Sequence, residues 1–183
     1  MNKKVWFALL KHPVPYEMEE YLEKMEEEGY SLMPLSDKSL FYYEFTECMS
    51  RKSIYIVDKS NLPKTMYMQG MLDREWEFIG NSGDCVIWRK IYEGERPKYD
   101  GDKYAVGLHC RKMGIIFCIA AVIAILAACA LIAGFTYEQT HGAEVKRYSY
   151  FVEAFFQLPL FFYCAIVARK FFEAYQKLCK KKR

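Results

Sequence analysis

The sequence has little histidine and lacks the short motifs of the common catalytic sites. Its three histidines, His12, His109 and His141, lie in three separate regions. Residues close in sequence therefore cannot supply a zinc ligand set or a histidine acid–base pair. The patterns G-x-x-x-x-G-K-[ST], G-x-G-x-x-G, G-x-S-x-G and H-E-x-x-H are all absent. We therefore expect a protein that is not an enzyme and holds no cofactor or metal.

Paired cysteines are also lacking. The seven cysteines are odd in number and scattered, and none forms a C-x-x-C pair. This pattern favours reduced thiols over a disulfide framework.

Charge divides the chain into two parts of different composition. Residues 1–112 hold 17 Lys and Arg against 19 Asp and Glu, whereas residues 113–183 hold 9 against 4. The first part is polar and rich in aromatic residues, and the second contains two long apolar runs and a basic end. A purely soluble monomer is therefore excluded.

The two apolar runs predict two membrane-spanning helices. Residues 114–135 are 22 residues without a charge, and a helix of that length covers roughly 33 Å, close to the hydrocarbon thickness of about 30 Å. Residues 150–168 are apolar apart from Glu153, Gln157 and Pro159. A head of this size has no second shell that could bury both helices, so the lipid bilayer is their expected environment.

Lysine and arginine indicate the orientation. They lie just before the first run and just after the second, while the connection holds two basic residues balanced by two glutamates. This distribution predicts a two-helix protein of the cell membrane with both termini in the cytoplasm. The expected parts are a cytosolic domain (1–104), a juxtamembrane linker (105–113), the two helices (114–135 and 150–168), an external loop (136–149) and a basic cytoplasmic tail (169–183).

The basic tail has two interpretations. It carries seven Lys and Arg and one Glu, interleaved with aromatic residues as in helices that lie at lipid headgroups. Alternatively, the charges only hold the C-terminus inside. The candidate lipid-contacting residues are Lys177, Lys180, Lys181 and Lys182.

The head shows an alternation of strand and helix patterns. The first helix has an apolar stripe, ends at Gly29, and carries seven glutamates on a face predicted to be solvated. The two central strands are predicted to pair as a hairpin. The predicted elements are a strand at 4–10, a helix at 14–28, strands at 40–46 and 53–57, a helix at 61–74 and a strand at 84–91.

An internal repeat supports this order. A shift of 46 positions aligns Tyr30 with Trp76, and likewise Tyr42 with Trp88. Two β-α-β halves of this kind predict an α+β fold of the ferredoxin-like type, with the split β-α-β order βαββαβ and both helices on one side of an antiparallel sheet. An alternative α+β order has an extra hairpin through residues 32–35.

The head resembles a known family over residues 4–105. The resemblance rests on the segments E-Y-L (20–22), G-Y-S-L (29–32), Y-I-V-D (55–58), W-E-F (76–78) and W-R-K (88–90). These segments resemble sequences of a bacterial family, the domain of unknown function 2812. The resemblance implies a cytosolic head often followed by membrane helices and encoded beside PadR-type transcriptional regulators. It implies no activity, ligand or catalytic residue.

One sheet face of such a fold is open, and Tyr42, Tyr55 and Trp88 are its candidate interaction residues. Aromatic residues on an open sheet can stack RNA bases. A head with a net charge of −2 lacks the basic patch that nucleic acid requires. We therefore expect a protein partner or self-association. The hypothesis is a membrane-anchored, non-catalytic binding or regulatory module, and the alternative is an accessory subunit of a transporter or other membrane complex.

Overall fold

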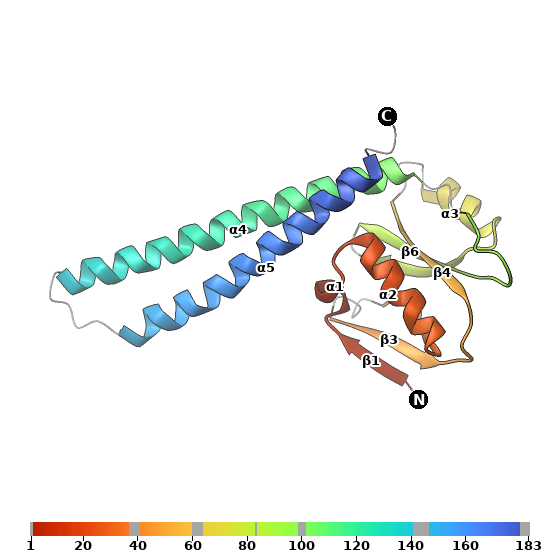
Figure 1. The fold of residues 1–183 in the computed structure, drawn as a ribbon, viewed down its shortest axis with the longest axis horizontal. Coiled ribbons are helices and arrows are strands. Elements are labelled where there is room, and N and C mark those ends of the chain that lie inside the picture. Colours follow the sequence, from red (N-terminus) through yellow and green to blue (C-terminus); the bar gives the residue numbers. More distant parts are fainter. Residues whose placement is uncertain are drawn as a thin grey trace. The chain divides into compact units, whose positions relative to one another are not determined.

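The computed structural model describes residues 2–36, 41–59, 64–82, 84–98, 102–140 and 147–179. The chain divides into two compact units. The head unit comprises Met1–His109 and Gln176–Arg183, and the helical unit comprises Cys110–Tyr175. The head unit is a mixed α+β structure, whereas the helical unit consists of parts of two long helices (Figure 1).

The first half of the head forms one antiparallel three-stranded sheet, sheet A. Its strands are arranged in the order β1-β3-β2. Helix α2 begins at Pro15, a residue suited to the first turn, and the chain leaves it at Gly29 with φ 86°. The elements are β1 (Asn2–Trp6), α1 (Ala8–Lys11), α2 (Pro15–Glu27), β2 (Tyr30–Leu32) and β3 (Tyr42–Glu47).

The second half repeats this arrangement as sheet B. Its elements are β4 (Ser53–Asp58), α3 (Lys64–Leu72), β5 (Glu77–Ser82) and β6 (Cys85–Ile91). The strands are antiparallel in the order β4-β6-β5, so the last strand of each half is central. The internal repeat therefore corresponds to two strand-helix-strand-strand halves.

The repeat is not a uniform shift of 46 positions. Leu32 pairs with Phe45 in sheet A, and Phe78 pairs with Trp88 in sheet B. Leu32 and Phe78 are 46 positions apart, whereas their strand partners Phe45 and Trp88 are 43 positions apart. The reason is the turn from β5 to β6, which is tighter than the connection from β2 to β3.

Three predictions about the strands are corrected by the structure. The strand predicted at 4–10 is wrong beyond Trp6, where β1 ends, because Ala8–Lys11 form helix α1. The described residues form two three-stranded sheets rather than the single four-stranded sheet of a ferredoxin-like fold, because residues 30–32 and 77–82 add strands β2 and β5. In addition, β3 and β4 lie in different sheets and do not form a hairpin. The alternative order with an extra hairpin through residues 32–35 is closer to the observed fold. Leu32 lies in β2, and the Leu35 N–H donates to the Ile79 carbonyl oxygen (2.8 Å).

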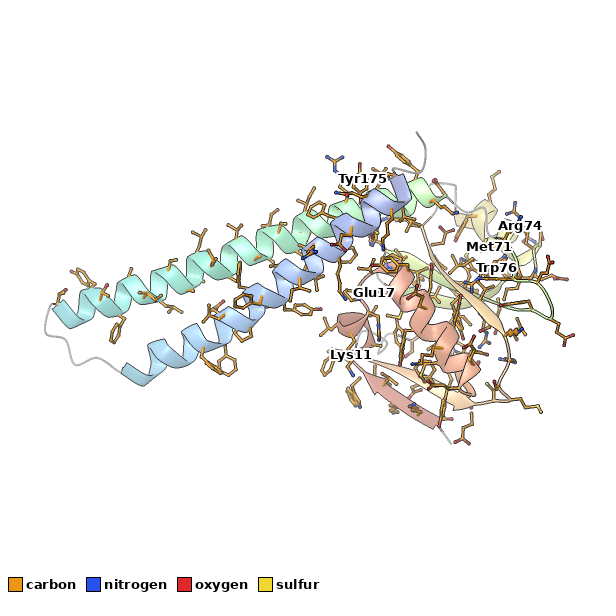
Figure 2. All side chains as sticks on the ribbon, in the orientation of Figure 1. Lys11, Glu17, Met71, Arg74, Trp76 and Tyr175 are labelled. Carbon is orange, nitrogen blue, oxygen red and sulfur yellow. The ribbon has the colours of Figure 1, made fainter. Side chains whose placement is uncertain are left out.

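Two apolar clusters hold the head together. The larger cluster joins α2 to both sheets and includes Leu22, Phe45 and Ile87, all fully buried. The smaller one lies between sheet B and α3 and includes Met71, Trp76 and Trp88. Met71 and Trp76 lie side by side at the end of α3 (Figure 2). Since both faces of sheet B are covered, every residue of β4 is buried.

The two long helices are α4 (Lys103–Thr140) and α5 (Arg147–Cys179). Both contain stretches long and apolar enough to cross a membrane by length and composition, Lys103–Tyr137 and Phe155–Cys179. Few side chains in the most apolar parts of these stretches are buried, unlike those of a core helix in a soluble protein. In the helical unit, the small residues Ala121 and Ala124 are buried.

The predicted linker and tail are largely helical. Helix α4 begins at Lys103, and the Asp102 carboxylate accepts a hydrogen bond from the Ala105 N–H (3.0 Å) as an N-cap. Residues 105–113, the predicted juxtamembrane linker, therefore lie within this helix. Residues 169–179 belong to α5. Much of the predicted external loop, residues 141–146, lies outside the described residues.

Candidate functional site

A buried ionic cluster lies where the end of α2 meets both sheets. Glu26 is fully buried, accepts hydrogen bonds from the Tyr55 hydroxyl (2.5 Å) and the Arg51 Nε (2.7 Å), and lies 3.6 Å from an Arg89 nitrogen. The Arg89 guanidinium donates to both carboxylate oxygens of Glu77, at 2.8 and 2.7 Å, and to the Ser31 hydroxyl. We call Glu26, Arg51, Tyr55, Glu77 and Arg89 the Glu26 cluster.

The Glu26 cluster joins elements that are far apart in the sequence. It connects α2 to β4, β5 and β6 and to the segment before β4. Burial, followed by the hydrogen bond to Glu26, raises the pKa of Tyr55, which therefore remains a neutral donor. Each buried charge in the cluster has a partner of opposite sign. This arrangement is that of a structural clamp, because no reactive group is left free for a substrate.

Helix α2 also covers the outer edge of β4. The Tyr55 N–H donates to the Glu23 carboxylate (3.3 Å), and the Val57 N–H donates to the Glu19 carboxylate (2.8 Å). An edge strand otherwise exposes such groups for pairing with another chain. The prediction of a solvated acidic face is therefore wrong for Glu19, Glu23 and Glu26, because these side chains satisfy β4 and the Glu26 cluster.

A cavity of about 190 Å³ lies beside this covered edge, within the head unit. Its polar lining consists of Glu19, Asp58, Arg96 and Lys103, and its apolar lining comes from β4 and from the ends of the long helices. We call it the β4 pocket. The complete lining is Glu19, Ile54, Tyr55, Ile56, Val57, Asp58, Arg96, Lys103, Val106 and Leu178.

The charged groups of the β4 pocket differ in how they are satisfied. Arg96 holds both oxygens of Glu23, at 2.8 and 2.9 Å. Asp58 is buried and accepts a hydrogen bond from the Tyr67 hydroxyl (2.8 Å). Lys103 makes no hydrogen bond or ion pair within the part of the chain that the structure describes. The ammonium group of Lys103 is therefore available to a ligand.

Glu19 is a titratable acid that lines the pocket. Burial raises the pKa of its carboxyl to about 7, and the nearby charges of Glu23 and Asp58 add to this effect. The hydrogen bond from the Val57 N–H and the charge of Arg96 act in the opposite direction. Glu19 therefore changes protonation state near neutral pH, within a pocket that also holds a lysine.

The aromatic residues predicted from the sequence do not share an exposed face. Tyr55 and Trp88 are 1% and 0% exposed. They belong to different apolar clusters, Tyr55 to the one around α2 and Trp88 to the one beneath α3. Tyr42 lies in the other sheet, where its ring packs against Trp6 at 5.0 Å. Two of the three are buried because both faces of sheet B are covered.

Of the predicted lipid-contacting lysines, the structure describes only Lys177. Its ammonium group lies over the Tyr16 ring of α2, 4.9 Å from the centroid, within the head unit. The other three, Lys180, Lys181 and Lys182, lie outside the described residues.

The sequence interpretation missed the β4 pocket, although one signal for it was present. Glu19, Glu23 and Glu26 have spacings of four and three, so they form one row along α2. A row of acids beside the apolar stripe indicates a helix that also meets polar groups of the protein. Nothing in the local sequence pointed to Arg96 or Lys103, because they reach the pocket from segments distant in the chain.

Comparison with known proteins gives one match. No curated protein and no solved structure matches the chain. A family model described as protein of unknown function (DUF2812) matches residues 15–122. The match begins later and extends further than the resemblance over residues 4–105, and it reaches well into α4. It includes every described element from α2 to β6 and every lining residue of the β4 pocket except Leu178. Because this match covers more than half of the chain, the protein belongs to the DUF2812 family.

Proposed function

We propose that the protein is a membrane-anchored binding module whose head unit faces the cytosol. In this proposal α4 and α5 hold the protein in the bilayer, and the head unit binds a ligand without catalysing a reaction. Support for the anchor comes from the two stretches of sufficient length and apolar composition. Support for the orientation comes from the basic residues that flank them.

One observation carries the proposal: the β4 pocket is lined by the sheet and by the ends of both long helices. Ile54 and Ile56 come from β4, Lys103 and Val106 from the first turn of α4, and Leu178 from the end of α5. A ligand in this pocket would contact all three elements at once. Its binding energy would therefore favour one arrangement of the helix ends over others, as a sensor requires.

The lining indicates the chemical class of the ligand. The aliphatic side chains suit an apolar body, and Lys103 suits a carboxylate or phosphate group. A cavity of about 190 Å³ holds a small molecule rather than a peptide. We therefore propose a small organic anion as the ligand of the module.

The test is retention of a bound molecule by the purified full chain. The chain is extracted in mild detergent and studied by native mass spectrometry, beside a Lys103→Gln variant and a Lys90→Gln control. Lys90 lies in β6, where it donates to the Arg74 carbonyl oxygen (2.8 Å), and does not line the pocket. We expect a small anion on the wild type and the control, and its loss from Lys103→Gln. Equal retention by all three proteins, or retention by none, would reject the pocket as the binding site.

The alternative function is an accessory subunit of a transporter or other membrane complex. Its support is the outer surface of α4, where Ile119, Val122, Ile123 and Leu126 are between 54% and 61% exposed. These side chains suit lipid as well as a neighbouring helix. Co-purification in mild detergent discriminates the two functions, because a stoichiometric membrane complex as the main companion favours the accessory subunit.

A further inference from the structure

A cluster of exposed apolar side chains lies at the corner where β1 ends and α1 begins. Trp6, Phe7, Leu10 and Phe41 are between 49% and 58% exposed. They are contiguous, since the Trp6 and Phe7 rings lie 6.3 Å apart and the Phe7 N–H donates to the Phe41 carbonyl oxygen (2.7 Å). We call these four residues the aromatic corner.

The backbone at the aromatic corner is strained. Phe7 has φ 56° and ψ 35°, a left-handed conformation that bulky residues rarely adopt. Its carbonyl oxygen accepts hydrogen bonds from the N–H groups of Leu10 and Lys11, at 3.0 and 3.1 Å, which hold this conformation. The fold thus maintains an unfavourable backbone conformation at a residue whose ring is half exposed. Such strain is characteristic of residues kept for a function.

Basic residues surround the aromatic corner. Lys4 lies two residues before Trp6 in β1, with its ammonium group 4.7 Å from the centre of the Tyr42 ring. Lys11 is exposed at the end of α1 (Figure 2). Among the described residues near the corner, Glu44 provides an opposing charge through its ion pair with Lys4 (3.0 Å). Because Glu44 offsets the charge of Lys4, Lys11 leaves these described groups of the corner with a net positive charge.

We propose that the aromatic corner docks on the anionic surface of the membrane that anchors the protein. Tryptophan and other aromatic side chains favour the headgroup region, and lysines beside them attract anionic lipid. A tethered head also meets the bilayer at a high effective concentration, so a small patch is sufficient for docking. This inference rests on the membrane anchoring in the proposed function.

A second copy of the chain fits the aromatic corner less well. A specific interface between proteins requires about 20 to 30 residues a side, and the corner has four. Strand β1 is an edge strand with the sequence NKKVW. Pairing of two such edges would bring lysines of both copies together, and charged residues on an edge strand oppose this association.

The tryptophans make the docking measurable in the full chain. The protein has three tryptophans, all in the head, and Trp76 and Trp88 are 5% and 0% exposed. Trp6 is therefore the one within reach of lipid. The full chain is placed in nanodiscs of brominated phosphatidylcholine, with or without phosphatidylglycerol. We expect bromine to quench Trp6 in the anionic discs, and the Trp6→Phe variant to lose this quenching.

Variants at the lysines and at the strained residue test the mechanism. Lys4→Gln and Lys11→Gln should each weaken docking about fivefold, whereas Lys90→Gln in β6 should have no effect. Phe7→Gly should reduce docking without unfolding the head, since glycine readily adopts the left-handed conformation. Its thermal unfolding supplies the control for folding.

The failures of the two proposals are distinguishable. If alkaline carbonate releases the chain from membranes, the anchoring fails. If the chain stays inserted but bromine does not quench Trp6, or quenches it equally in neutral discs, the docking proposal is wrong. Protection of Trp6 from iodide only in discs that hold two copies would assign the corner to self-association and would also overturn the proposal.

Discussion

Replacement of Arg89 by methionine tests the Glu26 cluster most directly. Arg89 is 8% exposed and is the cation shared by Glu26 and Glu77. Methionine fills much of the same volume without a charge. Glu77 has a side chain that is 52% exposed and can turn to water. Glu26 is fully buried and, among the residues that the structure describes, keeps only Arg51 as an ionic partner.

The expected magnitude follows from the charge left behind. Removal of one member of a buried ion pair costs about 3 to 5 kcal/mol, and the remaining contact with Arg51 places Arg89→Met near the lower end, at about 3 kcal/mol. Glu26→Leu should cost less, because Arg89 keeps its three hydrogen bonds to Glu77. The double variant, Arg89→Met with Glu26→Leu, removes both buried charges, so neither one is left without its partner. Its loss should fall below the sum of the single losses by about 1 kcal/mol or more.

The measurement is urea unfolding of the full chain in mild detergent, followed by tryptophan fluorescence. All three tryptophans belong to the head, so the signal reports the head unit while the long helices remain in detergent. The midpoint should shift while the slope with denaturant stays the same. A loss below about 0.5 kcal/mol for Arg89→Met, or strictly additive losses in the double variant, would refute the clamp.

Four further predictions concern single positions. Burial raises the pKa of Glu19 from 4.5 to about 7, so the contribution of this carboxyl to stability is present below pH 4.5 and is lost as the pH rises through 7. Glu19→Gln should therefore be more stable than the wild type at pH 8, by up to about 3 kcal/mol. A stability difference between the variant and the wild type that does not change with pH would contradict this. Gly80→Ala should lower the free energy of unfolding by about 2 to 3 kcal/mol in the urea assay. The reason is that φ of Gly80 is 148° and an added Cβ would lie 2.6 Å from the Leu35 side chain. Trp76→Ala should cost about 3 to 5 kcal/mol as a core residue, and a loss typical of surface residues would place it elsewhere. In intact cells that express a variant without the native cysteines, a membrane-impermeant thiol reagent should label a cysteine placed at Gly142 but not one placed at Ser36. The reverse labelling pattern would overturn the predicted orientation.

Local sequence patterns predicted α2, α3 and four of the six described strands of the head, but α1 lies in the segment 4–10 that was predicted as a strand. The apolar stripe through Met18, Leu22 and Met25 identified α2, and all three side chains are buried. The repeat identified two similar halves because corresponding helices must bury similar faces. Strands β2 and β5 were missed as separate elements. A strand of three residues such as β2 has too few positions for an alternating pattern to be visible.

Partners across the chain could not be predicted in the same way. Residues 40–46 and 53–57 are β-rich neighbours, and a hairpin is the usual outcome for such a pair. The structure separates them because β4 pairs with β6 and α2 covers its other edge through Glu19 and Glu23. The burial of Tyr55 and Trp88 has the same origin. A sheet covered on both faces is not distinguished by its composition from one with an open aromatic face.

The acidic composition of α2 follows from this position. A helix that packs beside the edge of a strand meets a row of unpaired N–H groups, which require acceptors. Glutamate reaches from a helix to such a row. A spacing of four places Glu19 opposite Val57 and Glu23 opposite Tyr55, two residues apart in β4. The Glu23 carboxylate in turn holds Arg96 beside the pocket. Glu19, which closes the edge of β4, thus also lines the β4 pocket, and Glu23 holds the Arg96 that lines it. The stability of the head and binding in this pocket therefore depend in part on the same side chains.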